Sequence, residues 1–343
     1  MKTLPFTTAV VFGTWLTVHA AAASYTISEL QTPWDYAVGL GGLTRGGAVA
    51  GTAVKGTNDS DSLNDSIAFL WKNGNAHELG ISPMLEGYFE VRGINRREEV
   101  VGGFTGTNNR ALWWRGGTMR DLGNLGGSHA FAYGINDLGD VVGAATVPGD
   151  NNWHAFLYRS GVMIDLGVFG GRDTFAFAIN NRRQIVIEYQ DSSANQLAIY
   201  HRGHFRIIGS IGGWTSGEAI NEAGHVVGVC QGEVEPGQHA FFYDGHRLVD
   251  LHVTGETFSE SKSINNWDEI VGTWGIDAGY DSQGGGFLYR KGQREEISAL
   301  LPPGSGWIIL TADYINDAGQ IVGVGLHNGV RKFYLLTPAN THR

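Results

Sequence analysis

Short apolar stretches separated by turns run along the whole chain, and one pattern of ten residues occurs seven times. The clearest copy, Gly134 to Gly143, reads GINDLGDVVG. The other copies begin at Gly42, Gly93, Ala178, Ala219, Ser263 and Tyr314. Repetition at a regular spacing is considered first, because it determines the architecture of the whole fold. We number seven repeat units in chain order by these decads.

Each decad has the pattern of a β-hairpin. Ile135 ends one strand, and the short side chain of Asn136 can bond the backbone two residues further on and start a turn. Gly139 stands where the loop needs a positive φ, and a β-branched pair begins the next strand. In units two, four and six this glycine is replaced by Glu98, Arg183 and Asp268. We expect those three turns to be strained or differently built.

Two further strand patterns follow the decads. The first is strongest as HAFLY, residues 154–158, and HAFFY, residues 239–243. The second carries Asp-Leu-Gly, as at residues 121–123 and 165–167. Together with the strands that enter and leave the decad, these give four strands, which we call a, b, c and d. No helical periodicity is sustained, so the sequence predicts an all-β fold.

The number of strands indicates a closed ring. The a, b and c strands occur seven times, but a d strand follows only six of the c strands. Residues 25–30, YTISEL, resemble a d strand and precede the first a strand, so they can complete the last sheet. The sequence therefore predicts a seven-bladed β-propeller of four-stranded antiparallel blades, closed by the N-terminal strand. Residues 24–343 are expected to form this single domain.

The first 23 residues have the features of a secretory signal peptide. Lys2 precedes an apolar run, residues 6–16, and four alanines at residues 20–23 suit the cleavage region. A membrane anchor formed by the same run is the alternative. No later segment approaches the ~20 apolar residues needed to span a bilayer. We therefore expect a mature protein that is secreted or periplasmic.

Charge and cysteine content narrow the choice of partners. Without residues 1–23, 23 basic side chains face 34 acidic ones, and no basic strip is present. This composition does not favour nucleic acid as a partner. Cys230 has no second cysteine to pair with, so we expect a buried thiol. The expected mature protein is a monomer that binds an extracellular carbohydrate or protein.

The repeated motifs together resemble the HAF-family extracellular repeat, named after its His-Ala-Phe triplet. The resemblance rests on GIN, VVG, HAFLY and DLGNLGG, and it covers nearly all of residues 25–336. It implies secretion and a repeat propeller, but no single activity. His154 and His239 match the eponymous histidine. Because this residue recurs at equivalent positions, we expect both histidines to be structural.

The variable loops of the predicted ring lie on one face. In a ring of up-and-down blades the b–c and d–a loops open on the same side, and irregular loops on a rigid scaffold often carry binding sites. Trp and Tyr beside carboxylates and amides suit sugar rings. The candidate ligand-binding residues are Trp34, Tyr88, Trp153, Trp214, Trp274, Tyr280 and Trp307. The alternative for each tryptophan is that it caps its own blade.

One group on this face has the composition of an acid–base site. His129 and Asp173 occupy corresponding positions in units three and four, and Arg172 precedes Asp173. Histidine supplies a base near neutral pH, and arginine can hold a carboxylate. His129, Arg172 and Asp173 are therefore the candidate catalytic residues if the protein is an enzyme of polysaccharide-lyase type. The alternative is that Arg172 and Asp173 pair with each other across a solvated loop.

No cofactor or metal site is expected. Asp59 and Asp61 have the oxygen density of a Ca²⁺ loop, but the ligand spacing and glycine of an EF-hand are missing. A weak Ca²⁺ site there is the alternative to a solvated acidic loop. His201 and His204 flank a c–d turn without a carboxylate or thiol companion, so zinc is not expected at this turn.

Three functions are left open by the sequence. The first is a secreted propeller that binds carbohydrate or protein through its b–c/d–a loop face. The second is a secreted enzyme acting on polysaccharide, with His129, Arg172 and Asp173 at the mouth of the central channel. The third is a structural or adhesive repeat protein. The sequence favours the first, because no catalytic motif is present.

Overall fold

The computed structural model describes residues 24–34, 36–54, 66–80, 88–106, 108–149, 152–169, 172–190, 195–233, 237–276 and 283–339. The expected signal peptide lies outside these ranges, as do Asp59, Asp61 and Tyr280. The described chain consists of β-strands and a short 3-10 helix, η3 (Ile297–Leu300), which confirms the prediction of an all-β fold. Within it, no helix is long and apolar enough to cross a bilayer.

Each decad forms the turn between the inner strand of its unit and the strand that follows it, as predicted. Unit one contains β2 (Tyr36–Leu43), β3 (Val49–Val54), β4 (Ser66–Lys72) and β5 (Asn75–Glu78). Unit two contains β6 (Tyr88–Ile94), β7 (Val100–Thr105), β8 (Arg110–Arg115) and β9 (Thr118–Asp121). Unit three contains β10 (Ala130–Ile135), β11 (Val141–Thr146), β12 (Trp153–Arg159) and β13 (Val162–Gly167). Unit four contains β14 (Thr174–Ile179), β15 (Ile185–Gln190), β16 (Asn195–His201) and β17 (His204–Ile207).

The remaining units follow the same order, except that the inner strand of unit seven is divided into β26 and β27, which both pair with β28. Unit five contains β18 (Thr215–Ile220), β19 (Val226–Gln231), β20 (Gln238–Tyr243) and β21 (Leu248–Asp250). Unit six contains β22 (Phe258–Ile264), β23 (Ile270–Ile276), β24 (Gln283–Arg290) and β25 (Gln293–Glu296). Unit seven contains β26 (Trp307–Ile309), β27 (Tyr314–Ile315), β28 (Ile321–His327) and β29 (Val330–Pro338), and β1 (Tyr25–Glu29) pairs with β29.

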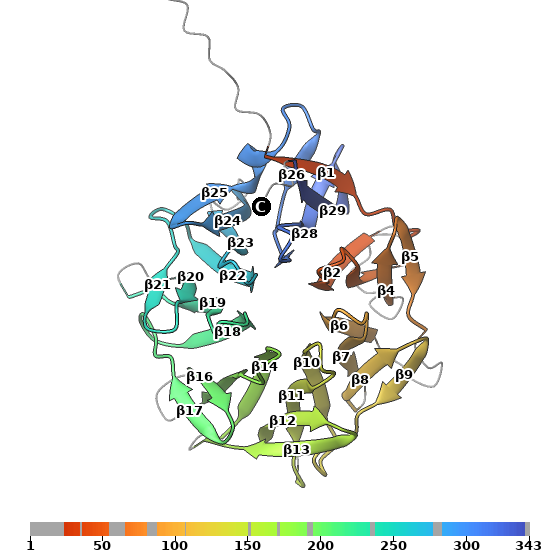
Figure 1. Cartoon of the computed structure of the whole chain (residues 1–343), viewed down its shortest axis with the longest axis vertical. Coiled ribbons are helices and arrows are strands. Elements are labelled where there is room, and N and C mark those ends of the chain that lie inside the picture. Colours follow the sequence, from red (N-terminus) through yellow and green to blue (C-terminus); the bar gives the residue numbers. More distant parts are fainter. Residues whose placement is uncertain are drawn as a thin grey trace, which may run out of the picture.

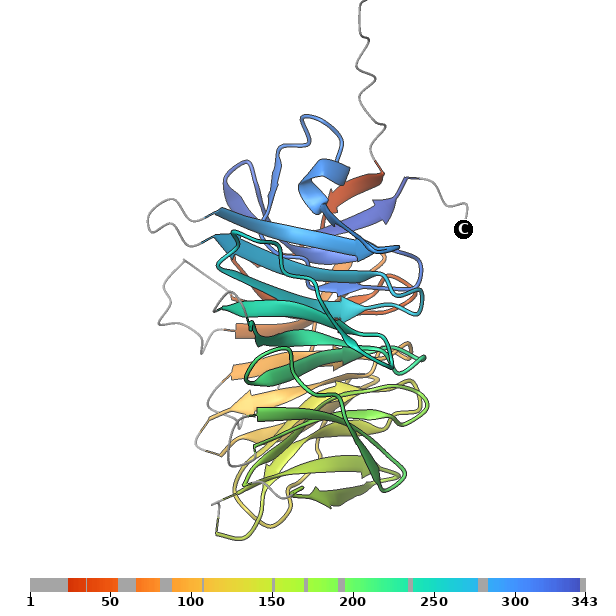
Figure 2. The same cartoon turned by 90° about the vertical axis from the view of Figure 1, so that its left-hand side faces the viewer.

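The sheets stand radially around a central opening, with the a strands innermost (Figure 1). Units one to four are separate four-stranded sheets. Units five and six share one eight-stranded sheet, because Gln238 and Phe258 form a single parallel pair between them. β1 runs antiparallel to β29 with Tyr25 opposite Pro338 and Glu29 opposite Tyr334, so the first and last strands lie side by side. The side view shows the strands of successive sheets stacked with a progressive twist (Figure 2).

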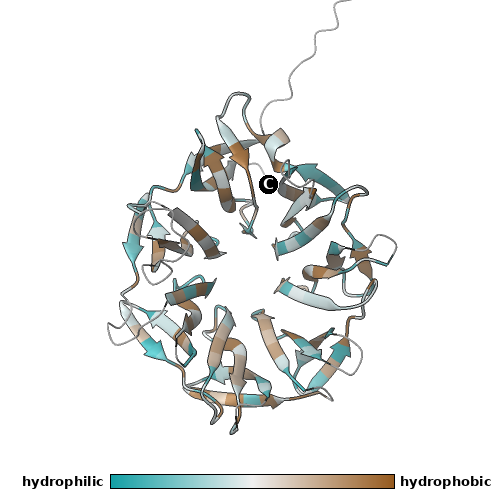
Figure 3. Ribbon diagram, turned by 180° about the vertical axis from the view of Figure 1, so that it is seen from behind, coloured by the Kyte–Doolittle hydropathy of each residue, from teal (hydrophilic) through white to brown (hydrophobic). Residues whose placement is uncertain are grey.

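Seven hydrophobic clusters fill the spaces between neighbouring units. Strand b is buried throughout in unit three, where apolar and small residues occupy β11, because this strand is covered on both faces. The N-terminal strand belongs to the same system: Tyr25 is buried with residues of units six and seven, and Leu30 with residues of units seven and one. Apolar positions accordingly follow the strands rather than the loops (Figure 3). Burial of this apolar surface is the main stabilising contribution.

The asparagines of the decads link each unit to the next. The Asn136 side-chain oxygen accepts hydrogen bonds from the N–H of Leu138 (3.0 Å) and of Asp140 (2.9 Å), as the turn pattern predicts. Its amide nitrogen then donates to the backbone oxygen of Asn180 in the next unit, at 3.1 Å. The same bond to the next unit is made by Asn95, Asn180, Asn221, Asn265 and Asn316. Unit one has Thr44 instead, and a threonine has no amide to donate.

The turns that lack glycine keep the same conformation as the others. Glu98, Arg183 and Asp268 have φ of 61°, 61° and 59°, in the left-handed region that Gly139 occupies with φ 84°. This region disfavours side chains with a Cβ, so the expected strain is present without any change in the turn. The side chains instead reach neighbours, for example Arg183, whose Nε donates to the Asp140 carboxylate at 2.7 Å.

Candidate functional site

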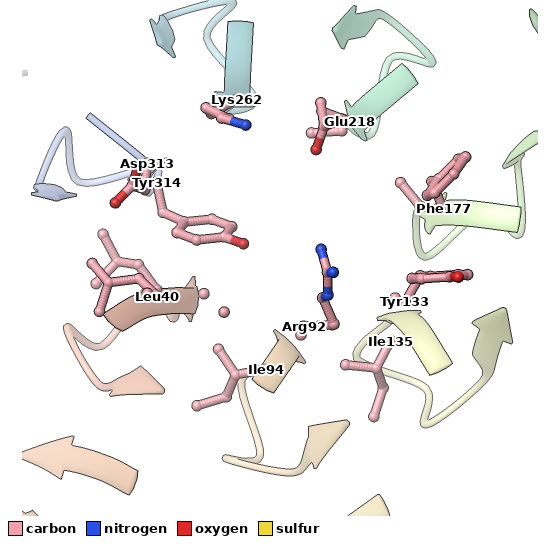
Figure 4. A pocket seen from close by; sticks show the side chains of 18 of the residues that line it. Leu40, Arg92, Ile94, Tyr133, Ile135, Phe177, Glu218, Lys262, Asp313 and Tyr314 are labelled. Carbon is pink, nitrogen blue, oxygen red and sulfur yellow. The ribbon is translucent and has the colours of Figure 1, made fainter. Parts of the chain in front are cut away.

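The inner strands enclose a cavity of about 400 Å³ along the axis of the ring (Figure 4). In every unit, the residue directly before the decad lines this cavity. These residues are Gly41, Arg92, Tyr133, Phe177, Glu218, Lys262 and Asp313. Equivalent positions of the repeat therefore carry seven chemically different residue types at this level of the channel. That variety is unlike the uniform decads, and it is the pattern expected of a surface that recognises a ligand rather than one that maintains the fold.

Units three and four form an aromatic wall on one side of the channel, made of Phe131, Tyr133, Trp153, Phe175 and Phe177. Trp153 stands at the outer end, with ring centroids 6.0 Å from Phe131 and 6.1 Å from Phe175. Phe131 continues to Tyr133 (6.2 Å) and Phe175 to Phe177 (6.1 Å). The inner pair, Tyr133 and Phe177, are 5.1 Å apart and line the cavity. All five side chains are partly exposed, so the wall offers aromatic surface from the mouth to the interior.

Charged side chains from the other units line the cavity beside and opposite this wall (Figure 4). Lys262 pairs with Glu260 at 2.5 Å, and Arg92 pairs with Glu90 at 2.9 Å. The Arg92 guanidinium also lies 6.0 Å from the Tyr133 ring centroid, where a cation interacts favourably with the π-system. The channel therefore presents hydrogen-bond donors and acceptors around the same space that the aromatic rings face.

Two carboxyl groups in this cavity have raised pKa values. Burial raises the pKa of Asp313 to about 6, and the Thr311 hydroxyl, which donates to it at 3.1 Å, offsets only part of this effect. Burial also raises the pKa of Glu218, and a hydrogen bond to Glu260 acts in the same direction. A carboxyl that exchanges a proton near neutral pH can both donate and accept hydrogen bonds.

Two of the three predicted catalytic residues, His129 and Asp173, contact Trp153 at the outer end of the aromatic wall. The Asp173 carboxylate accepts the backbone N–H of Trp153 at 2.8 Å, and the His129 ring lies 6.1 Å from the Trp153 ring. His129 Nδ1 accepts the backbone N–H of Asn109 at 3.2 Å, so in the neutral ring Nε2 carries the proton. His129 is thus arranged to donate a hydrogen bond. Arg172 is exposed, and its backbone N–H donates to Gln190.

The other predicted aromatic residues are spread over several environments. Trp34 is 6% exposed and packs against Phe69 in the core, with ring centroids 5.3 Å apart. Trp274 donates its indole N–H to Glu296, and Trp307 stacks on His327 with centroids 4.6 Å apart. Each of these three rings therefore packs against, or hydrogen-bonds to, a residue of its own unit.

Tyr88 and Trp214 are both partly exposed. Tyr88 is partly exposed and lines a smaller cavity together with Glu90, Arg92 and Tyr314. Trp214 is also partly exposed, at the position equivalent to His129 and Asp173. Of the predicted binding residues that the structure describes, Tyr88 therefore lines a cavity together with Arg92, Trp153 ends the aromatic wall, and Trp214 occupies the repeat position of His129 and Asp173.

Sequence reasoning missed the residues inside the channel, above all Arg92, Glu218, Lys262 and Asp313. The prediction concentrated on the irregular loops, whereas Arg92, Glu218 and Lys262 lie within inner strands and Asp313 directly precedes β27. The signal was available in the repeat itself. The residue before each decad faces the axis because alternate residues of a strand point the same way, and at this position the units differ strongly in chemistry.

The opposite mouth of the channel is an unsuitable ligand site. It is lined by the decad turns, including Asn136, Asn180 and Asn221. The side-chain amides of these asparagines are already hydrogen-bonded from unit to unit, as described above. A ligand would have to replace bonds that hold the turns together.

Comparison with known proteins identifies the fold. No protein-family model matches the sequence, and no curated protein matches it. The structure is similar to TolB from Acinetobacter baumannii, with a TM-score of 0.50 and 9% identity, covering 85% of this chain and 64% of TolB. It is also similar to the β-propeller domain of the Trilobed protease from Pyrococcus furiosus, with a TM-score of 0.52 and 10% identity, covering 89% of this chain and 94% of that domain. The chain thus spans a little under two thirds of the TolB length. Identities this low are informative about the fold alone, and the chain has a β-propeller fold.

Proposed function

We propose that this chain is a secreted seven-bladed propeller of the HAF-repeat type and that it binds an extracellular carbohydrate in its central channel. The blade count rests on the seven decads, each at the turn of an inner hairpin. Closure through β1 is supported by its pairing with β29 and by the burial of Tyr25 at the junction of units six and seven. Secretion rests on the sequence of residues 1–23 and on the HAF resemblance.

The proposal that the ligand is a carbohydrate rests on one observation: an aromatic wall and a set of hydrogen-bond donors and acceptors line the same cavity. A sugar ring has an apolar face that stacks on aromatic rings and a rim of hydroxyl groups that both donate and accept hydrogen bonds. Tyr133 and Phe177 supply the first surface, and Arg92, Glu218 and Lys262 supply the second. A cavity that combines apolar walls with a few convergent polar groups is a typical small-molecule site. The length of the wall suits an oligosaccharide better than a single sugar.

The mouth of the channel supports binding more than catalysis. A general base needs a free lone pair directed at the substrate. The one acceptor nitrogen of the neutral His129 ring, Nδ1, is occupied by the Asn109 N–H. With its proton on Nε2, His129 is suited to donate to a ligand hydroxyl.

The test is a glycan array probed with the mature protein, followed by calorimetry on the best oligosaccharide. Trp153→Ala and Phe177→Ala remove the two ends of the aromatic wall, and each should weaken binding about tenfold or more, which corresponds to ~1.4 kcal/mol. Trp267→Ala is the matched control, because Trp267 is 66% exposed in a decad turn, outside the channel. The proposal fails if no glycan binds, or if both wall variants bind like wild type.

A second candidate is an enzyme acting on polysaccharide, and the raised pKa values of Asp313 and Glu218 favour it. Acid–base residues of active sites commonly have such shifted values. The mature protein would be incubated with acidic and neutral polysaccharides, and both unsaturated uronate and new reducing ends would be measured. If His129→Ala abolishes the activity, the result would support a lyase with its site at the channel mouth. If only Asp313→Asn abolishes it, the catalytic site would lie inside the channel.

A further inference from the structure

A groove between the outer hairpin of unit four and unit five contains four of the 12 histidines of the chain. It has a volume of about 450 Å³ and is lined by His201, His204, His225 and His246. Arg206 and Asp244 are also part of its lining. The groove is separate from the channel, and nothing in the proposed function uses it.

Two pairs of histidines line this groove because units four and five pack side by side. His201 and His204 are opposite each other in the β16–β17 pairing, so their side chains project on the same face. Arg206 ties β17 to unit five by donating to the backbone oxygen of Gly245, at 3.2 Å. A Cβ added to Gly245 would lie 3.7 Å from His225 Nε2, and His246 is the next residue along that turn. The companions that His201 and His204 lack in the nearby sequence thus come from the neighbouring unit.

Two of the histidines are held in the orientation that a metal ligand needs. His201 Nδ1 lies 3.3 Å from the backbone oxygen of Arg183, and His225 Nδ1 lies 2.7 Å from the Asp268 carboxylate. Both partners are acceptors, so in each neutral ring Nδ1 carries the proton and Nε2 keeps its lone pair. Metal-binding histidines usually show this arrangement, in which a carbonyl or carboxylate fixes the ring from behind.

The cationic side chains near the groove are already engaged. The Arg206 guanidinium lies 5.3 Å from the Tyr243 ring centroid and bonds Gly245. Arg247 bonds the Asp244 carboxylate at 3.4 Å, and that carboxylate also accepts the backbone N–H of His246 at 2.9 Å. The Asp244 contacts therefore hold the turn that presents His246.

We propose that this groove binds a late first-row transition metal ion, Zn²⁺ foremost, between units four and five. His201 and His225 would ligate through Nε2, and His204 and His246 would complete the site. Imidazole ligands favour Zn²⁺, Cu²⁺ and Ni²⁺ over Ca²⁺ and Mg²⁺, which prefer oxygen. Among the described residues, no group of three or more His, Cys, Asp or Glu side chains is arranged to hold a metal ion. The proposed site would therefore require rotation of His204 and His246, which are both exposed.

Calorimetric titration of ZnCl₂ into the mature protein, freed of any affinity tag, tests the proposal. We expect one Zn²⁺ per chain at pH 7.5, no binding of Mg²⁺, and loss of Zn²⁺ binding near pH 5, where imidazoles are protonated. His204→Gln and His246→Gln should each weaken binding at least tenfold. Asp268→Asn changes the carboxylate behind His225, which also accepts the Asn221 amide at 2.8 Å, and it should weaken Zn²⁺ binding about 10- to 100-fold. His77→Gln is the control, since His77 is an exposed histidine on β5.

Thermal melting gives a second readout that does not depend on titration heats. Zn²⁺ should raise the Tm of wild type and of His77→Gln, but not that of His204→Gln, because only an intact site joins the two units. The proposal is overturned if Zn²⁺ does not bind, or if His204→Gln and His246→Gln bind it as wild type does. Binding of an anion below pH 6 with no Zn²⁺ binding at pH 7.5 would equally overturn it and indicate a protonated histidine patch.

Discussion

His154 Nδ1 lies 3.0 Å from both carboxylate oxygens of Asp165, and His239 Nδ1 lies 2.9 Å from Oδ2 of Asp250. In unit two an arginine replaces the histidine, and Arg110 donates to Asp121 at 2.7 Å. The histidine of His-Ala-Phe and the aspartate of Asp-Leu-Gly are therefore partners that join strand c to strand d. The aspartate also accepts the backbone N–H two residues further on, as Asp165 does from Gly167. The two sequence motifs thus supply the two partners of one side-chain interaction between strands c and d.

Replacing His239 should therefore affect stability rather than function. His239 is only 4% exposed, and His239→Gln should lower the free energy of unfolding by ~1 kcal/mol, the usual contribution of one hydrogen bond. Urea denaturation measures this change, and the affinity for the channel ligand should stay within about threefold of wild type. Unchanged stability with a large loss of ligand binding would contradict the structural role.

The gap in the asparagine links can be filled. Thr44→Asn would supply the amide that unit one lacks, allowing it to donate to the backbone oxygen of Asn95 in unit two. We expect the free energy of unfolding to rise by about 0.5–1 kcal/mol, measured by urea denaturation. Thr44→Ser is the control, because a serine keeps the hydroxyl that accepts the Ala48 N–H at 3.0 Å but adds no amide. Equal free energies of unfolding for the asparagine and serine variants would show that the link does not stabilise the junction between units one and two.

Removing the N-terminal strand should open the ring. Deletion of residues 24–31 would expose the edge of β29 to solvent and uncover the cluster in which Tyr25 is buried. An unpaired edge promotes aggregation, so we expect a large fall in Tm or precipitation. Light scattering and thermal melting check this outcome. A truncated protein that melts like wild type would exclude closure through β1.

Asp313 should make the stability of the protein depend on pH. Its folded pKa is about 6 against an ordinary 3.8, so the native state binds the proton more tightly than the unfolded chain does. Ionisation therefore destabilises the native state above pH 6, and this penalty disappears as pH falls from 6 to 4. Asp313→Asn should be more stable than wild type at pH 8, by up to about 2 kcal/mol once solvent access to the channel is allowed for. The difference should vanish near pH 4.

Urea denaturation of the two proteins at pH 8 and pH 4 makes the comparison. Asp317→Asn is a suitable control, because Asp317 lies in a decad turn at the opposite mouth. A constant difference between Asp313→Asn and wild type across this range would show that the Asp313 carboxyl titrates normally.

The local features of the fold were predictable, because each is set by residues close together in sequence. An Asn that bonds the backbone two residues on and a position with positive φ define the hairpin. Both recur in every decad except the first, which has Thr44 in place of the asparagine. Burial of Cys230 was also predicted correctly, and burial raises its pKa to about 12, which keeps the thiol protonated.

The sites depend on contacts between units, and these could not be read from the sequence. Asp313 and Glu218 are about a hundred residues apart in the chain, and only the radial packing of the sheets brings them to one cavity. The same holds for His204 and His246 in the histidine groove. Trp34 shows the opposite case: an aromatic residue in a loop position is buried because Phe69 and its neighbours leave space for it.

The asparagine link has a consequence for how such chains can change in length. Each link uses one side chain from one unit and one backbone oxygen from the next, as from Asn221 to Asn265. A duplicated unit would bring its own donor and its own acceptor, so the junctions on either side would re-form without any compensating substitution. The asparagine links therefore do not determine the number of units. The twist and packing of the sheets must set the circumference at which the first and last strands pair.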